Sequence, residues 1–80
     1  MWLRVHWDET NEAKIAEHDL TKEEVEDVVL DPFTNWTISK SSLRPLGRGW
    51  TSTGRFIAVP VDELDRDTVR PVTAYDVEEP

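Results

Sequence analysis

The chain has 80 residues, the length of one small domain, and we expect a single domain over 1–80 with 76–80 as a frayed tail. It contains no cysteine, which excludes disulfide bonds and thiolate metal sites and agrees with a reducing, cytoplasmic location. The first residues form no long apolar run, so we expect neither a signal peptide nor a membrane span.

The net charge of −8 is distributed unevenly along the sequence. Residues 1–31 carry ten acids and three bases, residues 32–61 carry four bases and no acid, and residues 62–80 carry seven acids and two bases. The central third is therefore a basic segment in an acidic protein. Two interpretations remain open: these bases neutralise the acidic segments within the fold, or they form an anion-binding surface.

The first two elements are a strand and a helix. Residues 2–7 alternate between apolar and polar side chains with a period of two, which predicts a strand. Asp8 follows and can cap a helix that ends near His18 and Asp19. The predicted apolar face of this helix carries Ala13, Ala16 and Leu20.

A second helix begins directly after the first. Thr21 as N-cap and Glu24 three residues later form a capping box, and Leu20 with Val25 forms the matching hydrophobic staple. The dipeptide Asp31-Pro32 ends this helix, because a residue that precedes proline disfavours the α region. The face predicted to pack on a sheet carries Val25, Val28 and Val29.

Short extended runs follow the second helix. We expect strands over 33–39, 43–51, 55–61 and 68–75, with a polar acidic connection over 62–67. Three prolines inside these runs cannot donate to a ladder and should lie at edges, bulges or strand ends; they are Pro45, Pro60 and Pro71. Short sequential connections predict an antiparallel meander with the helices on one face. The predicted fold class is α+β, in the order strand, helix, helix and three strands, with one further strand left open.

Four short motifs occur in a fixed order along the chain. Trp7-Asp8-Glu9 is followed by Lys14 and by His18 before the second helix, and Asp31-Pro32 follows that helix. Later come the hairpin Gly49-Trp50-Thr51-Ser52-Thr53-Gly54-Arg55 and the closing run Arg70-Pro71-Val72-Thr73-Ala74-Tyr75. In this order and spacing, over nearly the whole chain, they resemble the BrnT-like toxin family.

The resemblance implies a RelE-like fold, a ribonuclease activity that blocks translation, and neutralisation by a partner antitoxin. The chain departs from the family pattern at Tyr75, where a closing arginine is expected, and at 76–80, where many members continue into a basic helix. Proline also interrupts two of the predicted strands, which are apolar runs in the family pattern. Weakened catalysis is therefore expected, and the alternative is a protein-binding module on the same fold that has lost catalysis.

Metal-free RNA cleavage needs an acceptor for the 2′-hydroxyl proton, a donor for the leaving oxygen, and cations at the charged phosphorane. Arginine suits the last task because its planar fork binds phosphate bidentately. We predict Arg48 and Arg70 as catalytic residues and Arg44 and Arg55 as RNA-binding residues. The alternative for all four is surface charge that protects sheet edges from aggregation.

His18 is the third predicted catalytic residue, because an imidazole exchanges protons near neutral pH. Its alternative role is to complement the dipole at a helix C-terminus. Tyr75 is a predicted RNA-binding residue that could donate a hydrogen bond to phosphate, stack on a base, or simply pack on the sheet. The sequence has no His-Glu-x-x-His motif and no phosphate-binding glycine loop, so we predict no metal and no nucleotide cofactor.

Overall fold

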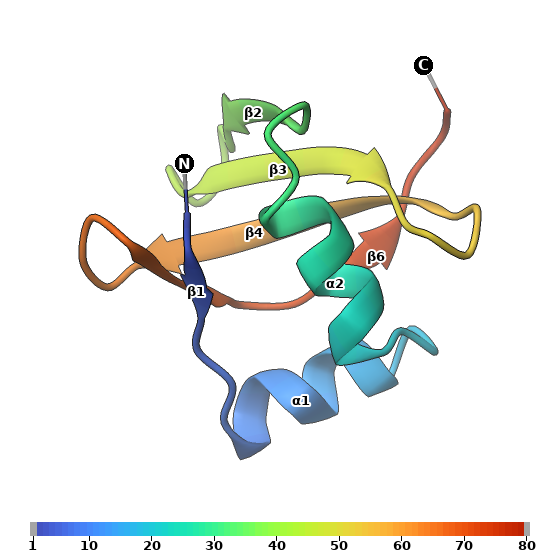
Figure 1. Ribbon diagram of the computed structural model, residues 1–80, viewed down its shortest axis with the longest axis horizontal. Helices are drawn as coiled ribbons and strands as arrows, with labels where there is room; N and C mark the ends of the chain where they lie inside the picture. The colour runs from blue at the N-terminus through green and yellow to red at the C-terminus, as the bar shows by residue number, and fades with distance from the viewer. Residues whose placement is uncertain (1, 80) are drawn as a thin grey trace.

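The computed structural model describes residues 2–79, in which two helices lie on one side of a six-stranded sheet (Figure 1). The elements are β1 (Arg4–Val5), α1 (Glu9–Ala16), α2 (Lys22–Val29), β2 (Asn35–Ile38), β3 (Pro45–Trp50), β4 (Phe56–Glu63), β5 (Thr68–Pro71) and β6 (Tyr75–Asp76). The predicted α+β class is confirmed. Within the described residues, no helix combines the length and the apolar character that crossing a membrane requires.

The sheet has the strand order β1-β5-β4-β3-β2, with β6 paired to β4. Strands β2 to β5 form the predicted antiparallel meander. The first strand, whose direction was not predicted, pairs with β5 in parallel, so the sheet as a whole is mixed. The chain leaves β1 into the helices and not into a tight hairpin turn, so no hairpin dictates an antiparallel direction for this strand.

The predicted strand 68–75 is divided into β5 and β6 by a bulge. Val61 lies opposite the end of β5 and Ala58 lies opposite the start of β6, and between these pairs the register shifts by one residue. The Pro60 carbonyl accepts a hydrogen bond from Val72 in the bulged segment, where the proline itself offers no N–H in return. The other two prolines lie at strand ends, Pro45 at the start of β3 and Pro71 at the end of β5. The prediction for the three prolines is confirmed.

Helix α1 is joined to the sheet through a buried amide. The Asp8 carboxylate caps the helix by accepting from the Asn11 N–H at 3.0 Å, and the Asn11 carbonyl oxygen accepts from the Asp8 N–H at 2.8 Å. The Asn11 amide nitrogen then donates to the backbone carbonyls of His6 and Pro71, both at 3.0 Å. One fully buried side chain therefore fixes the start of α1 against β1 and β5.

The predicted apolar face of the first helix is wrong. Ala13 and Ala16 are exposed, and Ile15 is the buried apolar residue of α1. A methyl group buries much less apolar area than a butyl side chain, so isoleucine decides which side of this short helix faces the core. Leu20 is buried as expected, but it lies beyond the end of α1.

Helix α2 is built as predicted. The Thr21 hydroxyl accepts from the Glu24 N–H at 3.2 Å, and the Glu24 carboxylate accepts from the Thr21 N–H at 3.1 Å, which completes the capping box. The three valines of the predicted face, Val25, Val28 and Val29, are all buried in the hydrophobic core. This face packs on β3 and β4.

The segment 76–80, predicted as a frayed tail, begins inside β6. Asp76 is paired with Ile57 of β4, and the Val77 N–H donates to the Phe56 carbonyl at 3.1 Å. Pro80 lies outside the described residues.

We expect Val28→Asp to prevent folding. Val28 is fully buried, and an unpaired carboxylate there costs several kcal/mol. That cost is comparable with the total stability of a small domain, about 5–15 kcal/mol. Circular dichroism and urea unfolding would measure the loss, with exposed Ala13→Asp as the control for adding an acid to a helix. Equal stability of the two variants would contradict the packing of α2 on the sheet.

Candidate functional site

The side chains of β3 divide between the two faces of the sheet. Its two glycines face the helices: a Cβ on Gly47 would lie 2.9 Å from the Trp36 ring, and one on Gly49 would lie 3.4 Å from Val28. Because side chains alternate along a strand, Arg48 projects from the opposite face, and its side chain is exposed. The close packing of the inner face thus positions Arg48 on the outer face.

Arg48 belongs to a row of residues that crosses four strands. Asn35 is paired with Arg48, Arg48 with Ala58, and Ala58 with Tyr75, so all four project from the same face. Ala58 is fully buried, so its methyl group is covered by the larger side chains around it. Arg48 and Tyr75 are two strand spacings apart, or about 10 Å at the backbone. The ring of His18 lies beyond, with its centroid 6.2 Å from that of Tyr75.

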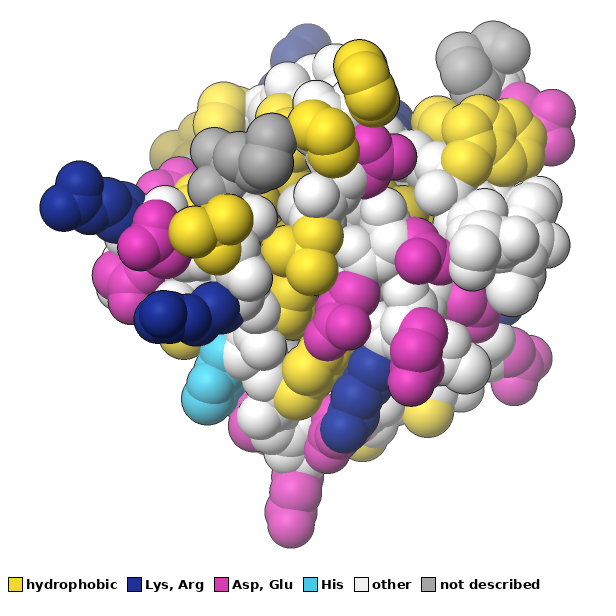
Figure 2. Space-filling view, viewed as in Figure 1, with side chains coloured by type: hydrophobic (Ala, Val, Ile, Leu, Met, Phe, Trp, Pro, Cys, Tyr) yellow, Lys and Arg dark blue, Asp and Glu magenta, His cyan; other side chains and the backbone are white. Residues whose placement is uncertain are grey.

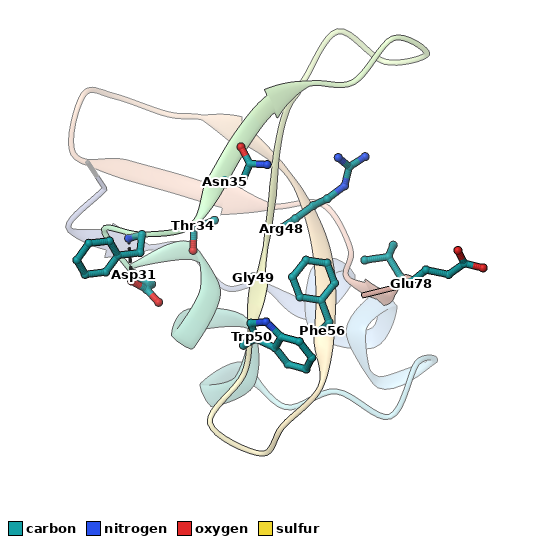
Figure 3. Close-up of a pocket in the computed structure, with 10 residues that line it drawn as sticks. Asp31, Thr34, Asn35, Arg48, Gly49, Trp50, Phe56 and Glu78 are labelled. Atoms are coloured by element: carbon teal, nitrogen blue, oxygen red, sulfur yellow. Dashed lines mark hydrogen bonds between the residues drawn. The ribbon is translucent and has the colours of Figure 1, made fainter. Parts of the chain in front are cut away.

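An aromatic cleft of about 560 Å³ opens beside Arg48 (Figure 3). Trp50 and Phe56, paired across the β3–β4 hairpin, form one wall with ring centroids 5.1 Å apart and planes inclined at 57°. Phe33 also lines the cleft, with a side chain that is 92% exposed. The polar lining residues are Asp31, Thr34, Asn35, Arg48 and Glu78. The cleft therefore combines apolar ring faces with one guanidinium and two carboxylates.

Arg70 and Arg44 lie elsewhere, in a network of carboxylates. The Arg70 guanidinium donates to both carboxylate oxygens of Asp8, at 2.8 and 3.2 Å, and lies 4.0 Å from Asp62. Arg44 donates to the same Asp62 at 2.7 Å. Asp62 is four residues from Ala58 along β4, so this network is about 13 Å from the row that contains Arg48. The structure does not bring the two predicted catalytic arginines together.

The pairing with Arg70 has an electrostatic consequence for Asp8. The guanidinium, together with the Asn11 N–H, lowers the pKa of the Asp8 carboxyl from 3.8 to about 2. Asp8 caps α1 and Arg70 belongs to β5, so this ion pair ties the first helix to the sheet. Arg70 therefore has a structural role that explains its position.

Arg55 fixes the loop that carries His18. Its guanidinium donates to the Asp76 carboxylate at 2.7 and 3.0 Å, and to the backbone carbonyls of His18 and Asp19 at 2.9 and 2.7 Å. The Asp76 carboxylate raises the pKa of Arg55, and Arg55 in turn lowers the pKa of Asp76. Arg55 thus positions His18 next to Tyr75. The donors of its guanidinium are used in these hydrogen bonds.

Arg48 differs from these three arginines because it takes part in no ion pair within residues 2–79. Protection of sheet edges does not explain any of the four. Among the described residues the strands with a neighbour on one side only are β1, β2 and β6, and none of the four arginines lies in them. Figure 2 views the helical side of the molecule, where carboxylates cover much of the surface. The free guanidinium is on the other face of the sheet.

The aromatic cleft was not predicted from the sequence. The pattern that indicates it is the hairpin, because Trp50 and Phe56 flank the turn at equal distances and must lie opposite each other. Gly54 adopts the left-handed conformation in this turn, with φ of 85°, which favours glycine there. Phe33 has no comparable indication in the sequence.

No group of three or more His, Cys, Asp or Glu residues within 2–79 is arranged to hold a metal ion. Comparison of the chain with models of known protein families gives no match, and comparison with functionally characterised proteins gives none either. The functional assignment rests on the geometry of this chain and on its sequence motifs.

The Asp8–Arg70 pair makes stability depend on pH in the acid range. Because the pKa of Asp8 is lowered on folding, its contribution is present above pH 3.8 and is lost as the pH falls towards 2. Asp8→Asn keeps a capping side chain but removes the charge, so it should be less stable than the wild type at neutral pH.

The difference between Asp8→Asn and the wild type should shrink as the solution is acidified, which urea unfolding at neutral pH and near pH 2 would measure. Glu17→Gln, at an exposed carboxylate, is the control for charge removal. A constant difference between Asp8→Asn and the wild type at both pH values would contradict the ion pair.

Proposed function

We propose that this chain is a BrnT-like toxin with a RelE-like fold, acting in the cytoplasm on single-stranded RNA, with weak and metal-independent cleavage. The observation that carries the proposal is the row formed by Arg48, Tyr75 and His18, with the aromatic cleft at one side. Three of the six residues predicted from the sequence thus lie in this row or next to it.

The cleft offers both contacts that single-stranded nucleic acid uses. Bases stack on aromatic rings whatever their identity, and each stacked base contributes about 1–3 kcal/mol. Trp50, which is 47% exposed, and Phe56 can supply that contact. A guanidinium without a carboxylate partner, as in Arg48, can bind the adjacent phosphate bidentately.

The same row can support transfer of the phosphoryl group. His18 would accept the 2′-hydroxyl proton while the 2′-oxygen forms a bond to phosphorus and the bond to the 5′-oxygen breaks. Arg48 would stabilise the negative charge that develops on the phosphorane. The departing 5′-oxygen would take a proton from the Tyr75 hydroxyl, and exchange with solvent would return a proton to Tyr75 and remove the one held by His18. Each role uses only a group already present in the row.

The charge of the protein limits this activity. Arg44, Arg55 and Arg70 are paired with carboxylates, so the first interpretation of the basic segment, internal neutralisation, accounts for three of the four candidate arginines. Affinity for RNA depends on basic side chains that have no carboxylate partner, because these displace counterions from the phosphates. The net charge of −8 opposes RNA binding. We therefore expect weak binding that is lost at moderate salt.

A protein-binding module is the second candidate. It is favoured by the exposure of Phe33 and Trp50 at the cleft, because exposed aromatic area with a nearby arginine is typical of interface centres. An antitoxin that covered this face would block RNA from the same residues. The two candidates thus share a surface and differ in whether the chain itself binds RNA.

We expect Arg48→Ala to weaken binding of a short single-stranded RNA about tenfold or more, and to reduce the slope of log affinity against log salt by about 0.7. Arg44→Ala removes the same charge from a residue already paired with Asp62, so it should leave both quantities nearly unchanged. Fluorescence anisotropy at several salt concentrations measures both. Equal losses in the two variants would mean that RNA responds to overall charge and not to the site.

Expression of the wild type in a sensitive bacterial host should slow growth and degrade RNA, and Arg48→Ala and His18→Ala should each relieve the effect. Both side chains are exposed, so these variants should fold. RNA binding without growth arrest would mean that the chain binds RNA and does not cleave it. Absence of both RNA binding and arrest would favour the protein-binding module.

A further inference from the structure

Strand β2 gives the sheet an unprotected edge. Within residues 2–79 it pairs only with β3, so its other side has no strand beside it. Edge strands are usually protected by charged residues, proline or very short length. The sequence of β2, Asn35-Trp36-Thr37-Ile38, contains neither a charge nor a proline. The opposite edge, β1, has two residues and carries Arg4.

The register identifies the groups that face outward from this edge. The Ser39 N–H donates to the Arg44 carbonyl at 2.8 Å, which continues the β2–β3 ladder by one pair. Hydrogen-bonded and non-hydrogen-bonded pairs alternate in an antiparallel ladder, so Thr37 directs its backbone groups towards β3. The N–H and C=O groups of Trp36 and Ile38 then point away from the sheet.

The surroundings of this edge are apolar. Trp36 packs edge-on against Trp2, with ring centroids 6.2 Å apart, and Ile38 is 62% exposed. These residues and Pro45 border a cleft of about 340 Å³.

The same end of the molecule is electrically neutral. It consists of residues 2–4, 36–45 and 62–68, which meet through the pairing of β1 with β5 and the ion pair between Arg44 and Asp62 (Figure 1). These segments contain four acids, Asp62, Glu63, Asp65 and Asp67, and four bases, Arg4, Lys40, Arg44 and Arg66. The rest of the chain therefore carries the whole net charge of −8. Two copies can approach at this end with the least mutual repulsion.

We propose that a second copy of this chain docks on β2, antiparallel, about a twofold axis at Thr37. Each Trp36 would exchange its outward N–H and C=O bonds with Ile38 of the other copy, because these residues lie opposite each other when Thr37 faces Thr37. Ile38 of one copy then packs on Trp36 of the other. The contact is self-complementary, as a twofold interface requires, and it joins the two sheets into one.

A single cysteine tests this register. The chain has no cysteine, so Thr37→Cys introduces only one thiol, on an exposed side chain. Facing residues of a non-hydrogen-bonded pair have Cα atoms about 4.5 Å apart, at the lower end of the range that disulfides span, about 4.4–6.8 Å. Mild oxidation at low protein concentration should convert Thr37→Cys into a covalent dimer. Thr53→Cys, also exposed but in the β3–β4 turn, should remain largely uncrosslinked. Equal crosslinking of the two variants would overturn the proposal.

Sedimentation equilibrium tests the interface without a crosslink. The wild type should form dimers, and Ile38→Lys should weaken association at least tenfold while the circular dichroism spectrum is unchanged. Leu64→Lys adds the same charge at the same end of the molecule but away from β2, and should associate like the wild type. A wild type that stays monomeric would overturn the proposal. The partner of the β2 edge would then be a strand of a different protein. A dimer that Ile38→Lys does not weaken would overturn it as well.

Discussion

The inner face of β3 is packed so closely by Trp36 and Thr34, with helix α2 beside them, that glycine occupies positions 47 and 49. A Cβ at position 49 would lie 3.1 Å from the Thr34 hydroxyl and 3.4 Å from Val28, and one at position 47 would meet the Trp36 ring. Both glycines face inward, so the residue between them faces outward. Arg48 is consequently held on a short, well-packed strand, with its side chain on the face opposite the acidic helices. Packing of the core thus determines where the free guanidinium lies.

Carboxylates determine what the remaining arginines do. In a chain of seventeen acids and nine bases, three of the four candidate arginines are paired with carboxylates. Asp8, Asp62 and Asp76 each bind an arginine that the sequence predicted to be catalytic or RNA-binding. These contacts tie α1 to β5, the β2–β3 turn to β4, and the His18 loop to β6. The positive charge is used to hold the fold together, which is why one cation and not four is available at the candidate site.

The sequence predicted well those features that depend on local interactions. The Asp8 cap of α1, the capping box of α2, the valine face of α2 and the strand-end prolines follow from side chains within a few residues of one another. Features that depend on distant partners were missed or misassigned. Asn11 is buried because its amide meets the carbonyls of His6 and Pro71, and no local pattern contains that information. The same applies to Arg70, whose assignment required knowing that Asp8 is its neighbour.

The proposed dimer bears on the weakness of the candidate RNA site. A twofold axis perpendicular to the joined sheet keeps both copies of Arg48 on the same face, because Thr37, Asn35 and Arg48 share that face in each copy. Three strand spacings across and four residues along the strands would separate the two guanidinium-bearing positions, or about 20 Å. One RNA strand could then contact both copies, and linked contacts strengthen binding without any new residue. Each copy has one unpaired arginine at the candidate site, so pairing of the two β2 edges would bring a second such cation to the same face of the joined sheet.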